Sequence, residues 1–106
     1  MNKLILAAAA LSLFTCGPAI AGDAAAGQKL SQACVACHGA DGKSSSSEFP
    51  RIAGQHSDYL VQALKDYRSG VRKNPIMAPM AGNLTPRDID DLAAYFSSQK
   101  GLVTKY

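Results

Sequence analysis

The chain has 106 residues, with eleven lysines and arginines, eight acidic residues, a formal net charge of +3 and no tryptophan. A chain of this length forms one small domain with a limited hydrophobic core of its own. Its weak positive charge lacks the clustered basic excess of nucleic-acid-binding proteins, so we expect no nucleic acid partner.

Residues 1–21 have the pattern of a cleaved secretory signal peptide. Lys3 supplies the charged start, an apolar run extends from Leu4 to Phe14, and Ala19-Ile20-Ala21 forms a small-x-small cleavage site. The apolar run is too short for a permanent membrane-spanning helix. We therefore expect export to the periplasm and a mature domain of residues 22–106, which holds ten basic and eight acidic residues.

Cys16 lies within this segment, and Leu13-Phe14-Thr15-Cys16 faintly resembles a bacterial lipoprotein cleavage site. Phe14 and Thr15 are bulky for that motif, and a better cleavage site follows at Ala21. We expect Cys16 to leave with the signal peptide, and a lipid-anchored chain is the alternative.

The first predicted helix of the mature domain extends from about Asp23 to Cys37. Asp23 suits the N-cap position, and Gly27 permits the close approach of another helix. Within this helix lies Cys34-Val35-Ala36-Cys37-His38, a C-x-x-C-H sequence, which is the attachment signal for haem c. The two cysteines lie one helical turn apart, so both sulfurs can add to the vinyl groups of one haem. His38 falls near the same face and is the expected proximal iron ligand.

The cysteine pair is also compatible in part with two other kinds of site. A structural zinc site needs four ligands, and Cys34, Cys37 and His56 leave the set incomplete. A thioredoxin-like redox pair needs a strand before the motif and a βαβ context, neither of which the sequence indicates. A covalently attached haem also explains how so small a domain acquires a core.

Two further helices are predicted, and no segment has the pattern of a strand, so the expected fold class is all-α. One helix extends from Ser57, its expected cap, to Ser69, and Gly70 ends it. The other extends from about Thr85 to Gln99, with Thr85 as N-cap and Pro86 at the first helical position.

Long loops over residues 39–56 and 71–84 separate the helices, and we expect a cofactor to order them. The serine run over residues 44–47 is predicted to be a solvated loop tip. Because the second loop contains Met77 and Met80, these are candidates for the sixth iron ligand together with His56. Either methionine can instead be a gap-filling core residue.

Taken together, these motifs resemble a class I cytochrome c. The chain is most similar to the single domains repeated in tandem in dihaem bacterial periplasmic cytochromes c, although it has only one C-x-x-C-H sequence and is thus expected to be monohaem. The stretches that carry the resemblance are Gly22-Asp23, Gly27-Gln28, residues 34–39, Asp41-Gly42, residues 49–55, Tyr59-Leu60, Met77-x-x-Met80, Leu84-Thr85 and residues 91–96.

The resemblance implies a small fold of three main helices, with long loops around one covalently bound haem. It implies that Met77 is the sixth ligand, with Met80 as the alternative, and that the carbonyl of Pro50 accepts a hydrogen bond from His38 Nδ1–H. The first and third helices should cross at Gly27 and Leu30. Arg51 is expected either to pair with a haem propionate or to remain a solvated surface residue.

In function, the resemblance implies a periplasmic one-electron carrier rather than an enzyme. It would receive electrons from a membrane cytochrome complex or a dehydrogenase and deliver them to a terminal oxidase or reductase, with a homodimer as one assembly to consider. Arg68, Arg72 and Lys73 form either a docking patch or an ordinary solvated face. The alternatives are an electron-entry subunit permanently bound to a dehydrogenase or oxidase, and a haem sensor with a displaceable sixth ligand.

Overall fold

The computed structural model describes residues 9–12 and 22–102, and this part of the chain contains five helices and no strand. The helices are α1 (Ala24–Leu30), α2 (Gln32–His38), α3 (Ser57–Ser69), α4 (Met77–Gly82) and α5 (Pro86–Ser98). The all-α fold class is confirmed. The first of the three main helices expected is divided into α1 and α2, α3 and α5 are the other two, and the short α4 lies in the second long loop. The proposed signal cleavage site and Cys16 lie outside the described residues, among which no helix is long and apolar enough to cross a membrane.

The first predicted helix is in fact two helices, α1 and α2, because the helix is interrupted at Ser31. Ser31 is 1% exposed, and its hydroxyl donates to the carbonyl oxygen of Gln28 at 2.7 Å. Its N–H is shared between the carbonyls of Gly27 and Gln28 at 2.9 and 3.3 Å. A serine hydroxyl that bonds to a carbonyl of the preceding turn bends or interrupts a helix. The break leaves the whole C-x-x-C-H sequence on α2.

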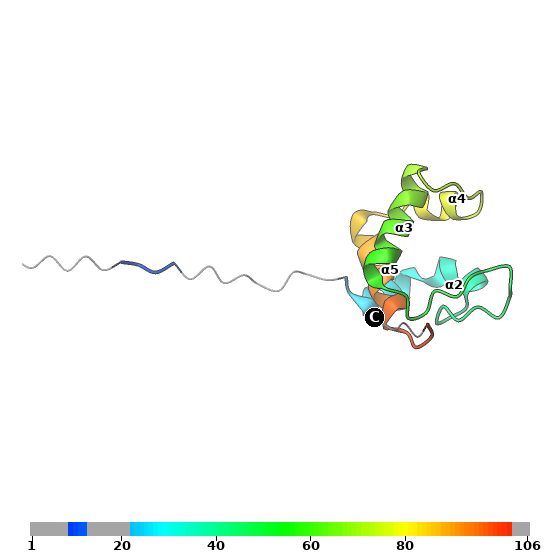
Figure 1. Ribbon diagram of the computed structural model, residues 1–106, viewed down its shortest axis with the longest axis horizontal. Helices are drawn as coiled ribbons and strands as arrows, with labels where there is room; N and C mark the ends of the chain where they lie inside the picture. Colours follow the sequence, from blue (N-terminus) through cyan, green and yellow to red (C-terminus); the bar gives the residue numbers. More distant parts are fainter. Residues whose placement is uncertain (1–8, 13–21, 103–106) are drawn as a thin grey trace, which may run out of the picture.

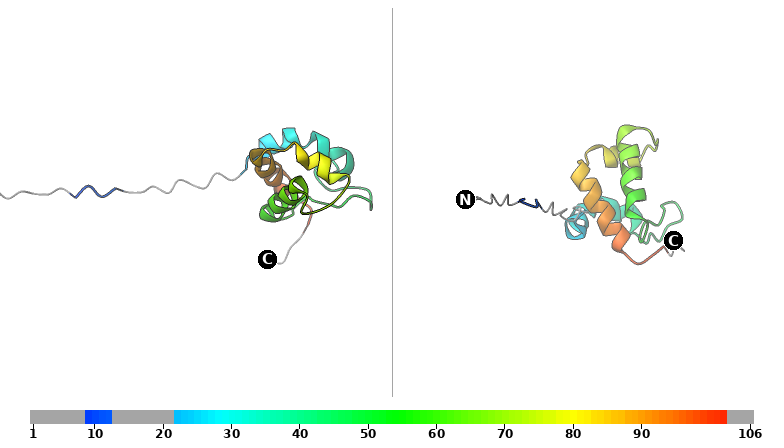
Figure 2. Two further views of the ribbon diagram at one scale, coloured as in Figure 1. Left: turned by 90° about the horizontal axis from the view of Figure 1, so that it is seen from above. Right: turned by 60° about the vertical axis from the view of Figure 1, so that its left-hand side comes forward.

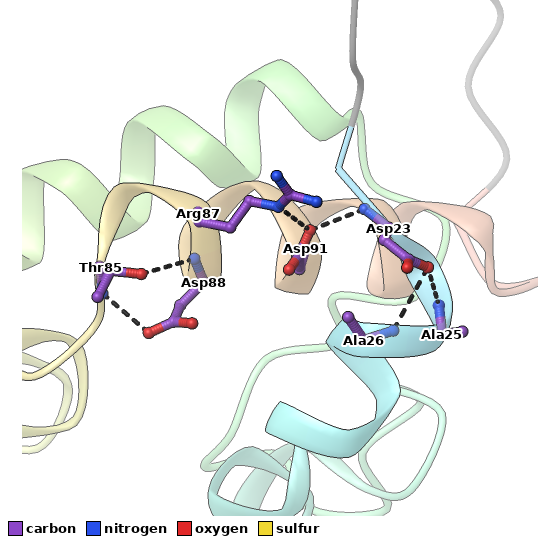
Figure 3. Close-up of polar contacts among 7 residues, drawn as sticks. All are labelled: Asp23, Ala25, Ala26, Thr85, Arg87, Asp88 and Asp91. Carbon is purple, nitrogen blue, oxygen red and sulfur yellow. Dashed lines mark hydrogen bonds and ion pairs between the residues drawn. The ribbon is translucent and has the colours of Figure 1, made fainter.

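The crossing of α1 with α5 brings the two backbones into direct contact. A Cβ atom at Gly27 would lie 1.9 Å from the carbonyl oxygen of Asp91 and 2.8 Å from the Cβ of Tyr95, so only glycine fits. The crossing expected at Gly27 is thus confirmed. Leu30, the other residue expected at the crossing, is 37% exposed. Asp23 is the predicted N-cap of α1, and its carboxylate accepts from the N–H groups of Ala25 and Ala26 (Figure 3).

The buried carboxylate of Asp91, on α5, stabilises this crossing. Asp91 accepts a hydrogen bond of 2.8 Å from the backbone N–H of Asp23, and the same oxygen lies 3.4 Å from Arg87 Nε (Figure 3). Since the Asp91 side chain is only 6% exposed, these contacts provide the partners that a buried carboxylate needs. The start of α1 is therefore tied to the middle of α5.

The bounds of α3 agree with the prediction, although its cap does not. The N-cap is His56, whose side chain makes no capping hydrogen bond, so the expectation that Ser57 caps the helix is wrong. Gly70 ends α3 as predicted, because its φ of 85° lies in the left-handed region that glycine adopts without strain.

Helix α5 begins with the predicted cap and supplies most of the core. Thr85 Oγ1 accepts from the N–H of Asp88 at 3.1 Å, and Asp88 accepts from the N–H of Thr85 at 2.9 Å (Figure 3). This reciprocal capping box satisfies two N–H groups that would otherwise lack partners. The central core cluster comprises Leu60 of α3 and, from α5, Leu92, Ala93, Tyr95 and Phe96.

The second long loop contains a short helix that the sequence did not predict. Residues 77–82 form α4, which packs against α3. Figure 1 shows α2 and α4 extending to the same side of the α3–α5 pair, and Figure 2 shows α4 between α2 and α3 when the molecule is seen from above. The C-x-x-C-H sequence and the two methionines of α4 therefore occupy the same side of the molecule.

Candidate functional site

A cavity of about 370 Å³ lies among α2, α3, α4, α5 and the loop between α2 and α3. Most of its lining is apolar and includes Leu60, Leu64, Ile76, Leu92 and Phe96. The side chains that can bind a metal or form a covalent bond at its wall are Cys34, Cys37, His38, Met77 and Met80. Every predicted site residue from these two segments thus lines one cavity, and Pro50 lines it as well.

His38 is buried, and one nitrogen of its ring is already engaged. The Nδ1 atom lies 2.8 Å from the carbonyl oxygen of Pro50. Because a carbonyl oxygen only accepts, Nδ1 carries the hydrogen and donates it. This tautomer leaves the lone pair on Nε2, which is the atom that an imidazole needs free to bind a metal. The hydrogen bond that the resemblance implied is therefore present.

The loop of residues 39–56 holds Pro50 beside His38 through backbone hydrogen bonds. The carbonyl of Gly42 accepts from the N–H groups of Ile52 and Ala53 at 2.9 and 3.1 Å, which closes the base of the loop. Gly42 has a φ of 82°, and a Cβ there would lie 2.9 Å from a ring atom of Phe96. The loop is thus ordered against the core of the protein itself.

Part of the serine run also belongs to this ordered loop. Ser44 is 4% exposed, and its N–H donates to the carbonyl of His38 at 2.8 Å. Its hydroxyl donates to the carbonyl of Ser46 at 3.0 Å. The prediction of a solvated tip holds for residues 45–47 and is wrong for Ser44. Ser44 instead fixes the backbone at the end of α2.

Cys34 and Cys37 are free thiols at the wall of the cavity, and both are partly buried. Burial, together with the neighbouring Cys37, raises the pKa of the Cys34 thiol. Cys34 therefore remains a neutral thiol at neutral pH. A pair of thiols one turn apart beside an apolar cavity suits the attachment of a large apolar ring.

The three candidates for the sixth ligand differ in whether they line the cavity and in how far they are buried. Met77 and Met80, one turn apart on α4, both line the cavity. Met77 is partly buried, whereas Met80 is 41% exposed. His56 is exposed and does not line the cavity.

Several cavity residues received no role in the sequence analysis. Asn74 lines the cavity, and its side chain accepts from the N–H groups of Ile76 and Met77, each at 2.9 Å. The signal for this role is the Asn-Pro pair before the methionines, since asparagine favours an N-cap and proline the first helical position. The segment of residues 71–84 was predicted to be a loop, so no helix cap was predicted at Asn74.

Arg72 also lines the cavity, and it contacts two tyrosines. Its Nη1 donates to the hydroxyl of Tyr59 at 3.3 Å, and its guanidinium lies 4.8 Å from the ring centroid of Tyr67. Arg68 donates to the carbonyl of Leu84 at 3.1 Å and so joins α3 to the residue before the cap of α5. Both arginines of the expected basic patch therefore make contacts within the protein, and Arg72 and Lys73 are both exposed.

Comparison with known proteins identifies the class to which this fold and this cavity belong. The sequence model of the cytochrome c family matches residues 24–100, and the chain belongs to this family. It is 48% identical over 83 residues to cytochrome c-554(548) of Halomonas halodenitrificans, a match that covers 76% of this chain and all of that protein.

The similarity also extends to cytochromes c4, which are longer. The chain is 48% identical over 101 residues to cytochrome c4 of Pseudomonas aeruginosa, a match covering 94% of this chain and 50% of that protein. The crystal structure of reduced cytochrome c4 from Pseudomonas stutzeri superposes with a TM-score of 0.74 at 46% identity, covering 78% of this chain and 48% of that one. The chain thus spans about half the length of these cytochromes c4.

Membership of this family makes covalently bound haem c the cofactor of the protein. The cavity fits this group on several independent points. Its wall is mostly apolar, and the free thiols of Cys34 and Cys37 lie at one side. The Nδ1 of the buried His38 is hydrogen-bonded, and the thioethers of Met77 and Met80 lie on α4. The class I cytochrome c fold expected from the sequence is confirmed by the structural match.

Proposed function

We propose that this protein is a periplasmic one-electron carrier of a respiratory chain, in which His38 and Met77 would bind the iron of one haem c. The observation that carries the proposal is that a buried imidazole with its Nδ1–H engaged and a methionine thioether line the same apolar cavity. A protein with both axial positions filled by its own side chains leaves no open iron site for a substrate.

In this proposal each residue of the cavity has a defined task. Cys34 and Cys37 would hold the haem through two thioether bonds, and His38 would bind the iron through Nε2. The carbonyl of Pro50 orients the ring of His38 and increases its basicity. Met77 contributes a thioether, which raises the reduction potential relative to a second histidine. The bound haem supplies the chemistry, the exchange of one electron between ferrous and ferric iron.

The protein surface then governs how an electron enters and leaves. No side chain of the cavity needs to act as an acid, a base or a nucleophile, so the protein is a carrier and not an enzyme. Docking to a partner is expected to be brief and through a small surface, as in other redox encounters. The donor would be a membrane cytochrome complex or a dehydrogenase, and the acceptor a terminal oxidase or reductase.

One comparison favours the alternative of an electron-entry subunit. A protein of Stutzerimonas stutzeri that is 42% identical over 81 residues is named a thiosulfate dehydrogenase electron acceptor. A chain of this kind can therefore serve one dehydrogenase rather than a general pool. Under this alternative, the protein remains bound to its enzyme during purification.

The location and the form of the mature protein belong to the same proposal. Cleavage after Ala21 would release residues 22–106 into the periplasm, without a lipid on Cys16 and without nucleic acid as a partner. Because the cytochromes c4 are about twice as long as this chain, two copies of it in a homodimer would match their length.

Fractionation and redox titration test this function together. The cytochrome should be found in the periplasmic fraction, elute in gel filtration free of larger proteins, and titrate in a single one-electron step. Co-elution with a dehydrogenase or oxidase would favour the alternative. Rapid, tight binding of carbon monoxide by the ferrous protein would indicate a displaceable ligand and would contradict the carrier.

A further inference from the structure

The segment around Met77 is fixed by three hydrogen bonds that one residue, Asn74, accepts. Its side-chain oxygen accepts from the N–H groups of Ile76 and Met77, each at 2.9 Å. Its backbone carbonyl accepts from the N–H of Ala78 at 3.0 Å. Asn74 therefore controls the backbone on both sides of the methionine.

This pattern is that of a helix N-cap, three residues before the start of α4 at Met77. An N-cap asparagine accepts from the second and third helical residues, while its own carbonyl accepts the first intrahelical bond. With Asn74 as cap, Pro75 occupies the first helical position, where its missing N–H costs nothing. Met77 is then the third residue of the helix, and its own N–H is held by the cap.

The two methionines of α4 differ in how closely this cap controls them. Met77 is bonded directly to Asn74, and Asn74 itself is half-buried at the cavity wall. Met80 follows one turn later and is 41% exposed, although it lines the same cavity. The cap thus restricts the backbone that carries one thioether and leaves the other beyond its reach.

We propose that Asn74 is a positioning residue that fixes Met77 toward the iron and so selects it over Met80. The inference rests on the proposed function, because it presumes that Met77 is the sixth ligand. Loss of the cap should let Met77 leave the iron more often, without removing either methionine. The folded protein should then admit an external ligand faster and begin to use Met80 in its place.

The rate at which imidazole binds to the ferric holoprotein measures how often the sixth ligand leaves. Removing an N-cap side chain typically costs about 0.5–2 kcal/mol, which corresponds to a roughly 2- to 30-fold increase in the open population. We expect an increase of this size for Asn74→Ala and recovery toward the wild-type rate for Asn74→Asp, whose carboxylate keeps the acceptor.

A matched control lies at the other end of the same helix. Asn83 is exposed at the C-cap of α4, and its side chain makes no hydrogen bond to any described residue. Asn83→Ala removes the same chemical group, and the imidazole rate should stay within about twofold of the wild type, the change expected of a neutral surface substitution.

The outcomes separate this inference from the assignment of the ligand. If Met77→Ala binds imidazole no faster than the wild type, Met77 is not the ligand and the proposed ligation fails. If Met77→Ala is fast but Asn74→Ala matches Asn83→Ala, the ligation stands and the role of Asn74 is refuted. In the Asn74→Ala background, Met80→Leu should weaken the far-red methionine–iron band by the fraction of molecules in which Met77 has left the iron. A band of unchanged intensity there would overturn the selection.

Hydrogen exchange in the wild-type holoprotein gives a test that needs no variant. The amides of Ile76 and Met77 should be protected, because both donate to the Asn74 side chain. Exchange as fast as in an unstructured peptide would show that the cap does not form and would overturn the inference even if Asn74→Ala fails to accumulate.

Discussion

At the scale of single residues, the site depends on backbone carbonyls that hold side chains in one orientation. The Pro50 carbonyl sets the tautomer of His38, and the carbonyl of Ala40 accepts a hydrogen bond of 2.7 Å from the hydroxyl of Tyr95. Tyr95 belongs to the buried core, so this bond ties the chain just after the C-x-x-C-H sequence to α5. The orientation of the site is thus linked to the packing of the core.

Replacing Tyr95 with phenylalanine tests this link. The variant leaves the Ala40 carbonyl without its partner, and we expect a loss of about 1–2 kcal/mol in the free energy of unfolding. Denaturant unfolding of the holoprotein measures the change. Tyr59→Phe is the control, because Tyr59 is 50% exposed and water can replace its lost contact. Equal stability of Tyr95→Phe and the control would show that the hydrogen bond contributes nothing.

At the scale of helices, close backbone contact between α1 and α5 determines how the domain closes. A Cβ at Gly27 would approach the Asp91 carbonyl to 1.9 Å, whereas a Cβ at Gly82 would meet no atom within 4 Å. The two glycines lie in α1 and at the end of α4, so they offer a comparison between a crossing point and an open surface.

Alanine substitutions at these glycines should have opposite effects. Gly27→Ala forces α1 away from α5, and we expect destabilisation of about 1–3 kcal/mol or more, the usual range for overpacking. Gly82→Ala should be neutral or stabilise by up to about 1 kcal/mol, since alanine is the better helix former. Thermal unfolding of both holoproteins gives the comparison. A Gly27→Ala protein as stable as the wild type would contradict the close crossing.

The helices also show which parts of the fold the sequence could predict. The bounds of α3 and α5 followed from apolar spacing, the Thr85 cap and Gly70, because these signals are local. The interruption at Ser31 could not be predicted from local signals. A serine hydroxyl can face solvent or bond back to the helix, and burial against the rest of the domain decides which of the two occurs.

For the site too, the sequence predicted the residues with a specific local motif and not those whose role depends on the folded chain. The C-x-x-C-H sequence located the cysteines and His38 without any structure, because its spacing is specific. The cap by Asn74 was not found, since a segment rich in proline favours a loop and only the folded backbone shows which N–H groups a side chain reaches. The burial of Ser44 was missed for the same reason, as it depends on the chain folding back on His38.

At the scale of the whole molecule, the cavity occupies the place where a larger domain would have its hydrophobic core. Leu60, Leu92 and Phe96 belong to the core or the cluster around it and at the same time line the cavity. Ile76 and Met80 also line the cavity and are 54% and 41% exposed. A haem held there would cover these side chains, so binding of the cofactor and stability of the fold are coupled. The small size of the domain makes this contribution large.

Single cysteine variants test this coupling. We expect Cys34→Ala and Cys37→Ala to accumulate poorly in the periplasm, because each loses one of the two covalent links to the group that completes the core. Immunoblots of periplasmic fractions, together with a stain for covalent haem, measure both quantities. A stable, folded and haem-free protein would contradict the dependence of the fold on its cofactor.

The optical spectrum of the purified ferric protein, recorded for the wild type, Met77→Ala and Met80→Leu, tests the central claim most directly. If His38 and Met77 are the axial ligands, the wild type and Met80→Leu show a low-spin haem c spectrum with the weak far-red methionine–iron band, and Met77→Ala loses this band. Survival of the band in Met77→Ala, or its loss in Met80→Leu, would contradict the account.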